Sequence, residues 1–450
     1  MEYKMLKEKY NKFIYKNFEI LEDNENIYLK YYFEIQNLCT FSPNITIPKK
    51  EYEIFNLNTN LVKNIAFHIG MIESISYWKS TCSEYFYIEC GKLSQEQIEW
   101  FKKLIYFGLG EFRFVNNIKS SQADFIKIIS NGNFYNLEKN KNVLNDVIIP
   151  IGGGKDSNVT LELLKKMQYK RFGFRINQNE VSYKCAKIAG LLDNEIIEVT
   201  RKIDPELITL NKKGFLNGHT PFSALVAFLT YFVATIFGKK YIVLSNEDSS
   251  NESNVKGENI NHQYSKTIEF ENDFRNYVKK FICINGPEYF SFLRPISEIQ
   301  IAKLFSELEE YHKVFKSCNV GSKSTPWKWC CECPKCLFAF IILSPFLYKE
   351  KLIDIFGKDL FEKENLLQIF KELCGYENIK PFECVGTYQE IRYAISETIR
   401  KNKSIKLPFM LQYYKDNFEM IDLDILNYYN NNNNLPYEFE KVLKESLKIK

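Results

Sequence analysis

Three consecutive glycines are followed by a lysine, an aspartate and a serine in residues 147–164, which read VIIPIGGGKDSNVTLELL. The apolar residues before the glycines favour a buried strand, and those after them recur at helical spacing. Such a strand-to-helix junction can bind phosphate, because glycine lets the backbone approach closely and a helix N-terminus attracts an anion. The Ser157 hydroxyl and the Asp156 carboxylate, a group that suits Mg²⁺, would complete a nucleotide site.

Two common phosphate-binding motifs do not fit this stretch. A Walker A loop would need glycine at Ile149 and serine or threonine at Asp156, and the dinucleotide fingerprint would need glycine at Ser157. A glycine-rich turn without a ligand is the remaining alternative, but a plain strand-to-helix turn rarely needs three glycines.

The stretch resembles the SGGxDS loop of the PP-loop ATP pyrophosphatases, with glycine where the first serine is usual. These enzymes cleave ATP between the α and β phosphates to give AMP and pyrophosphate. The resemblance implies that ATP and Mg²⁺ are bound by Gly152, Gly153, Gly154, Lys155, Asp156 and Ser157.

A second group of residues with metal-ligand spacing is the cysteine cluster WKWCCECPKC. Cys330, Cys333 and Cys336 form CxxCxxC, and Cys318 lies twelve residues before the first of them. Four thiolates at these spacings can surround Zn²⁺ as a tetrahedron. The pattern resembles the zinc knuckle of PP-loop enzymes that make cyano-deazaguanine, with a wider gap after the first cysteine. A loop of free thiols and a catalytic thiol pair are the alternatives, and Cys331 is left over from the metal set.

The elements that position the glycine loop are predicted to form an α/β fold. The strand-like runs VIIPI, RFGFRI, EIIEVT and YIVLSN alternate with helical segments, which predicts a doubly wound parallel sheet. Ligands of such sheets bind beyond the carboxyl ends of the strands. Ser245, Asn246 and Glu247, at the end of YIVLSN, are therefore expected beside the glycine loop.

Three regions follow from these patterns. Residues 1–140 are predicted to be an N-terminal α+β domain, with a helix over residues 95–107 that a Ser94/Gln97 capping box opens. Residues 141–296 are the predicted ATP-binding domain. Residues 297–450 are predicted to be a mostly helical region that contains the cysteine cluster.

Composition limits the classes of function. The chain has 450 residues, 45% of them hydrophobic, and 60 basic against 56 acidic residues, so it lacks the charge excess typical of nucleic-acid binding. The first residues include no apolar signal region, and the twelve cysteines are accordingly expected to be reduced. Residues 222–237 are too short for a membrane span; they are expected to form a buried helix that Thr220 caps, with Pro221 in its first turn. The asparagine run at residues 430–434 is expected to be a surface linker.

Six further blocks resemble those of one PP-loop family, the UDP-N-acetyl-α-D-muramoyl-L-alanyl-L-glutamate epimerases, over about residues 60–390. The blocks are FHIGMIESISYWK, LIYFGLGEF, NGHTPFSAL, INHQYSKTIEFE, WCCECPKCLFAFIILSPF and KPFECVGT. The resemblance implies a cytoplasmic enzyme that inverts the terminal L-Glu of UDP-MurNAc-L-Ala-L-Glu and consumes ATP. It implies no nucleic-acid or membrane partner, and it leaves the oligomeric state open.

The implied reaction needs an activated carboxylate. An α-carboxylate resists loss of the neighbouring proton, whereas an acyl adenylate lets its carbonyl accept the electrons, so that a modest general base suffices. His219, His262, Cys331 and Glu247 are the candidate bases, with Asp156 as the candidate Mg²⁺ ligand. For the histidines, orienting a loop or a phosphate is the alternative role. An amide-forming or tRNA-thiolating PP-loop enzyme and a binding protein without catalysis are the alternative functions.

Overall fold

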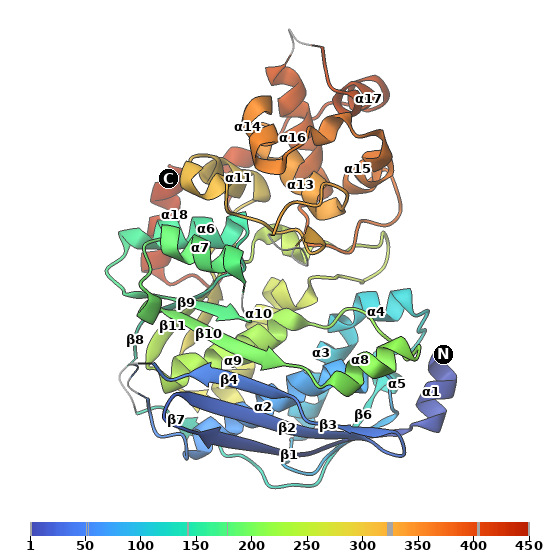
Figure 1. Cartoon of the computed structure of the whole chain (residues 1–450), viewed down its shortest axis with the longest axis vertical. Coiled ribbons are helices and arrows are strands. Elements are labelled where there is room, and N and C mark those ends of the chain that lie inside the picture. The colour runs from blue at the N-terminus through green and yellow to red at the C-terminus, as the bar shows by residue number, and fades with distance from the viewer. Residues whose placement is uncertain are drawn as a thin grey trace.

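The computed structural model describes residues 2–50, 52, 54–141, 144–177, 179–321, 327–402 and 406–448. Figure 1 shows helices α13 to α17 gathered at one end of the molecule and the long strands β1 and β2 at the other. The strands are β1 Lys12–Glu22, β2 Asn26–Ile35, β3 Cys39–Phe41, β4 Asn44–Pro48, β5 Tyr85–Ile88, β6 Lys127–Ser130, β7 Glu138–Lys139, β8 Asn145–Pro150, β9 Arg171–Ile176, β10 Ile196–Lys202, β11 Lys239–Leu244, β12 Cys283–Ile284 and β13 Glu288–Ser291.

Helices precede, connect and follow these strands. Their bounds are α1 Tyr3–Lys9, α2 Asn60–Trp78, α3 Gln95–Gly108, α4 Gly110–Val115, α5 Gln122–Phe125, α6 Lys155–Leu163, α7 Glu180–Ile188, α8 Pro205–Lys212, α9 Phe222–Ile236, α10 Ile268–Phe281, α11 Glu298–Ser306, α12 Glu309–His312, α13 Pro334–Leu343, α14 Lys349–Phe356, α15 Leu367–Leu373, α16 Tyr388–Lys401, α17 Phe409–Asn417 and α18 Tyr437–Leu447. The expected α/β class is confirmed, and the region after residue 297 is mostly helical, as predicted.

One sheet of eleven strands runs through the molecule in the order β13-β11-β8-β9-β10-β4-β2-β1-β5-β6, with β3 paired to β2. The five strands from β13 to β10 are parallel to their neighbours. Strand β4 then pairs antiparallel with β10, and β2 pairs antiparallel with β4 and β1. The four strands that the sequence predicts to be parallel are parallel, but they do not form a separate parallel sheet, because the same sheet continues through antiparallel strands of the N-terminal region. Strand β4 covers the free edge of β10, whose unpaired N–H and C=O groups would otherwise be exposed.

The parallel strands are buried on both faces. Successive strand residues point to opposite faces, and Val147 and Ile149 of β8 belong to one core while Ile148 between them belongs to the other. The first core includes side chains of α6 and α7, and the second includes side chains of α9 and α10. This two-sided burial explains why these strands read as continuous apolar runs.

Two helices test the predicted helix starts. Helix α3 begins with the predicted capping box, in which the Ser94 side chain accepts from Gln97 N and the Gln97 side chain accepts from Ser94 N. Helix α9 is buried as expected, but its N-cap is Pro221 and no side chain caps it, so the prediction of a Thr220 cap is wrong. No helix in the described part of the chain combines the length and apolarity that a membrane crossing requires.

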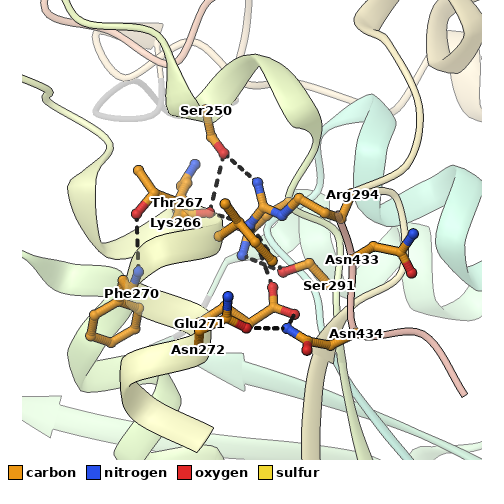
Figure 2. Close-up of polar contacts among 12 residues, drawn as sticks. Ser250, Lys266, Thr267, Phe270, Glu271, Asn272, Ser291, Arg294, Asn433 and Asn434 are labelled. Atoms are coloured by element: carbon orange, nitrogen blue, oxygen red, sulfur yellow. Dashed lines mark hydrogen bonds and ion pairs between the residues drawn. The ribbon is translucent and has the colours of Figure 1, made fainter. Parts of the chain in front are cut away.

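The asparagine run is held by specific contacts, which corrects the expectation of a simple surface linker. Asn430 Nδ2 donates to Asp248 Oδ1 at 2.8 Å, and its backbone N donates to Pro295 O at 2.7 Å. Asn434 Nδ2 donates to Oε1 of the buried Glu271 at 2.9 Å (Figure 2). The run therefore fastens the C-terminal segment to the residues that follow β11 and β13 and to helix α10.

Candidate active site

A pocket of about 420 Å³ lies at the carboxyl ends of β8 and β11. These two strands are neighbours in the sheet. Helix α6, which follows β8, lies on one face of the sheet, and helix α9, which precedes β11, lies on the other. Crevices at such points are the usual ligand sites of open α/β sheets. The predicted residues that line the pocket are Gly152, Gly154, Asp156, Ser157, Ser245, Asn246, Glu247 and the predicted metal ligand Cys318.

The glycine loop forms a tight turn into α6. Gly153 has φ +88°, and a Cβ there would meet Val181 Cγ1 at 2.8 Å, so glycine is required by conformation and by space. A Cβ at Gly152 would meet nothing within 4 Å, so the serine usual at this position would fit. Gly154 is the N-cap of α6 and no side chain caps this helix end. The first backbone N–H groups of α6 therefore have no capping side chain, and Gly154, Asp156 and Ser157 at this helix end line the pocket, as an anion site requires.

Lys155 turns away from the pocket lining and into a buried ion pair. Its Nζ contacts carboxylate oxygens of both Asp156 and Glu298, and its side chain is 7% exposed. Burial alone would lower the pKa of Lys155, but the charges of these two carboxylates raise it above the ordinary value. The ammonium group therefore anchors the start of α6 to the start of α11.

The end of β11 contributes a carboxyl group and an unsatisfied hydroxyl to the lining. Burial, followed by the charge of Asp156, raises the pKa of Glu247. Asn246 Nδ2 donates to Ser291 Oγ at 3.0 Å. Ser245 Oγ is buried and has no hydrogen-bond partner among the described residues. A buried polar atom without a partner is costly, and a bound ligand would satisfy this one.

The two candidate histidines lie together beside the pocket. Their ring centroids are 4.2 Å apart, and His262 Nδ1 is 2.5 Å from Glu111 Oε2. Burial would lower the pKa of His262, but hydrogen bonds with Cys384 and Glu111 raise it to about 9. Burial and the charge of His262 lower the pKa of His219 to about 3. His262 is therefore the charged member of the pair at neutral pH.

Cys384, Lys266 and Lys335 line the same pocket and were missed by the sequence reasoning. Lys266 Nζ donates to Cys384 Sγ at 3.1 Å, and Lys335 Nζ donates to the Cys384 carbonyl. Burial raises the pKa of the Cys384 thiol, but Lys266 and then His262 outweigh it and hold that pKa well below its usual value. All three residues lie in sequence blocks that resemble the epimerase family, and that resemblance is the signal that could have identified them. Their spacing in the sequence does not show that they meet in the fold.

Cys331 lies apart from the pocket. Its Sγ donates to the carbonyl of Phe356 at 3.1 Å, and the residue is buried in the core of the helical region. It is not part of the pocket lining. Its location gives it no direct access to a ligand beside the glycine loop.

The four predicted metal ligands meet as one cluster. The sulfur of Cys318 is 3.6 Å from that of Cys333, and the sulfur of Cys336 is 3.6 Å from Cys330 and 3.5 Å from Cys333. Zn–S bonds of about 2.3 Å in a tetrahedron separate the sulfurs by about 3.8 Å, so the arrangement fits Zn²⁺. Backbone N–H groups of Gly321, Cys331 and Glu332 also donate to these sulfurs, a second shell that favours thiolates.

The cluster Glu111, His219 and His262 also groups three metal-ligand types within 4.8 Å. Two N or O ligands of one zinc ion lie about 3.4 Å apart if their bonds are about 2.1 Å long. The 2.5 Å between Glu111 and His262 is instead a hydrogen-bond distance. The geometry therefore favours an acid–base pair at this place.

We expect the isolated protein to contain about one equivalent of zinc, because four thiolates form a closed structural site. Cys333→Ser should remove most of that metal and lower the midpoint of thermal unfolding, since the binding energy of such a site is part of folding. Elemental analysis and thermal denaturation measure the two effects. Cys331→Ser is the matched control, because its sulfur lies outside the cluster, and it should retain zinc. A stable, zinc-free native protein would contradict the site.

The described geometry can be compared with known proteins. The model of the MurL N-terminal domain matches residues 4–292, and that of the MurL C-terminal domain matches residues 314–422. The chain belongs to the MurL family. The first MurL domain thus covers both the predicted N-terminal region and the predicted ATP-binding region.

Three MurL relatives carry the description UDP-N-acetyl-alpha-D-muramoyl-L-alanyl-L-glutamate epimerase. Those from Micromonospora sp. and Salinispora tropica are each 38% identical over 250 residues, which is 55% of this chain. The chain therefore spans little more than half of their lengths, 55% and 54% respectively. The relative from Xanthomonas oryzae pv. oryzae is 29% identical over 358 residues, 78% of each chain.

Proposed function

We propose that the protein is an ATP-dependent epimerase that converts UDP-MurNAc-L-Ala-L-Glu to UDP-MurNAc-L-Ala-D-Glu for peptidoglycan precursor synthesis. The activity named for its MurL relatives supports this substrate. The observation that carries the proposal is one pocket that combines a glycine loop at a helix N-terminus with a thiol, an ammonium group and a carboxyl group. Because ATP and nucleotide-linked precursors occur in the cytoplasm, we place the reaction there.

The glycine loop is the proposed ATP site, of the PP-loop type. Support comes from the strand order β13-β11-β8-β9-β10, with helices in the cores on both faces. In this role the N–H groups of Gly152 and Gly154 hold phosphate oxygens, and the unpartnered Ser245 hydroxyl contacts the nucleotide. Mg²⁺, bound through Asp156, would neutralise phosphate charge. ATP is cleaved to AMP and pyrophosphate.

The acid–base residues serve the second half of the proposed reaction. The glutamate nitrogen of the substrate is an amide, so it cannot form a Schiff base, and its α-carboxylate must lose its charge before the α-proton can leave. Adenylation achieves this, after which the ammonium group of Lys335 can stabilise the enolate oxygen. Reprotonation on the other face inverts the carbon, and water releases AMP.

A product analysis tests the proposed function. Purified protein with ATP, Mg²⁺ and UDP-MurNAc-L-Ala-L-Glu should release AMP and pyrophosphate, and acid hydrolysis of the product should yield D-Glu. Neither product should form without the L-Glu precursor, because adenylation needs its carboxylate. Release of ADP and phosphate would refute the α/β cleavage. Release of AMP with complete retention of L-Glu would point to a ligase.

A further inference from the structure

We propose that the Cys384 sulfur exchanges a proton with the substrate α-carbon on one face, and that Glu111, His262 and Lys266 position and charge this sulfur. The assignment rests on the proposed epimerase function. It makes Cys384 a catalytic residue and the other three positioning residues.

The geometry around Cys384 is that of an activated thiol. Lys266 Nζ donates to the sulfur at 3.1 Å, and His262 interacts electrostatically with Cys384. His262 Nδ1 lies 2.5 Å from Glu111 Oε2, so Glu111 does not use the other ring nitrogen. A carboxylate, an imidazole and a thiol in series form the arrangement that generates a nucleophilic or basic sulfur. Cys384 also lines the pocket that contains the glycine loop.

Several elements bring charges to this sulfur. The cationic groups are Lys266 before α10, His262 in the preceding loop and Lys335 of α13; the acidic groups are Glu111 of α4, Asp156 of α6, Glu247 after β11 and the neighbouring Glu383. Lys266, His262 and Lys335 have the largest charge effects on Cys384, and they hold the pKa of its thiol well below its usual value. These positive charges favour the thiolate form of the sulfur over the thiol.

Lys266 is held rigidly at its backbone. Figure 2 shows its carbonyl oxygen among the donors of Arg294 and Ser250, and Ser250 Oγ donates to it at 3.1 Å. Thr267, the next residue, caps α10 by accepting from Phe270 N at 3.1 Å. The ammonium group is thus presented from a fixed turn, as a group that must hold a thiolate in one position requires.

The proposed step balances as a proton transfer. The α C–H bond of the adenylated glutamate breaks and an S–H bond forms, while the electron pair of the C–H bond moves toward the carbonyl, whose oxygen becomes an enolate. A solvent-derived proton then adds to the other face of the carbon and restores the carbonyl. The Cys384 thiol then releases its proton to solvent, which regenerates the thiolate; in the reverse direction the thiol gives its proton to the α-carbon. Solvent hydrogen is therefore incorporated at the α-carbon in each inversion.

Three of the other candidate bases fit this step less well. His262 Nδ1 is engaged by Glu111, and its pKa, raised to about 9, leaves it protonated. Cys331 donates to Phe356 O and lies away from the lining. His219 is neutral at pH 7 because burial and His262 lower its pKa to about 3, which makes it a weak base.

The test measures adenylation and proton transfer separately in the full-length protein. Substrate-dependent exchange of labelled pyrophosphate into ATP reports adenylation alone. Deuterium incorporation at the glutamate α-carbon in D₂O reports proton transfer. In Cys384→Ala and Cys384→Ser we expect pyrophosphate exchange within a few-fold of the unaltered protein, and deuterium incorporation reduced by roughly 10²- to 10⁴-fold. Cys39→Ala, a half-buried cysteine on β3, is the control and should behave as the unaltered protein.

The serine variant separates proton transfer from packing, because a hydroxyl fills the space of the thiol but does not ionise near pH 7. Its thermal midpoint should be unchanged. Deuterium incorporation within tenfold of normal in both variants would overturn the assignment, as would a covalent substrate adduct on Cys384 in acid-quenched protein. Absence of pyrophosphate exchange in the unaltered protein would remove the proposed function, and the assignment with it.

Discussion

Replacing Asp156 with alanine is expected to reduce the release of AMP and pyrophosphate by at least about 10²-fold, the typical effect of losing one preorganised charge-stabilising group. Asp156 is the carboxylate in the first turn of α6 that lines the pocket. The fold should survive the change. Lys155, its buried partner, keeps the carboxylate of Glu298, so no buried charge is left alone.

The matched control is Asp416→Ala. Asp416 lies on α17, and among the described residues its side chain hydrogen-bonds with the nearby Gln412 in an exposed contact, so turnover should not change. Ser157→Ala is the graded comparison. The Ser157 hydroxyl donates to Gly154 O at 3.1 Å, and loss of one hydrogen bond to a charged phosphate costs roughly tenfold. If Asp156→Ala kept normal turnover and an unchanged thermal midpoint, Asp156 would have no part in catalysis and the glycine loop would be only structural.

The glycine loop could be located from the sequence because its information is local. Three glycines between an apolar run and a helical pattern specify a strand, a turn and a helix, and Gly153 does adopt the positive φ that only glycine accepts easily. The CxxCxxC spacing is local in the same way, and Cys318 joins the other three sulfurs. The glycine loop and the cysteine cluster could therefore be predicted because each depends on residues that are close together in the sequence.

The acid–base cluster depends on contacts between distant segments. Glu111 and His262 are 151 positions apart, and Lys266 and Cys384 are 118 apart. A single cysteine or lysine in a polar stretch forms no periodic pattern. Its role can therefore be recognised only once the folded structure shows which residues it contacts. The antiparallel junction of β10 with β4 is non-local for the same reason, since register between remote strands is not written in either strand alone.

Replacing Arg294 with methionine is expected to lower the free energy of unfolding by about 3–5 kcal/mol, the usual cost of breaking a buried ion pair. The Arg294 side chain is fully buried, and Glu271 at its end is 2% exposed. Arg294 Nη1 donates to Glu247 O at 2.6 Å and to Ser250 Oγ at 2.7 Å, while Nη2 reaches Lys266 O and Glu271 (Figure 2). Methionine fills similar length but leaves these acceptors without a donor.

Denaturant unfolding of the full chain measures this loss, and two further variants identify its cause. Arg400→Met removes a partly exposed pair with Glu397, which should cost less than about 1 kcal/mol. Adding Glu271→Gln to Arg294→Met removes the stranded negative charge, and Asn434 can still donate to the amide oxygen. This double variant should recover part of the lost stability; equal stability of Arg294→Met and the unaltered protein would contradict the argument.

Arg294 also connects the stability of the fold to the proposed chemistry. Its guanidinium binds the carbonyl groups of Glu247 and Lys266, the backbone of two pocket-lining residues. In Arg294→Lys the charge remains, but a single ammonium cannot span the same acceptors as a planar fork. We therefore expect the free energy of unfolding of Arg294→Lys to lie closer to that of the unaltered protein than the value for Arg294→Met does. Arg294→Lys should nevertheless lose more deuterium incorporation at the α-carbon than pyrophosphate exchange. The reason is that Lys266, whose backbone Arg294 binds, holds Cys384, whereas the glycine loop is left intact. Equal losses in both measurements would mean that Arg294 supports the pocket as a whole.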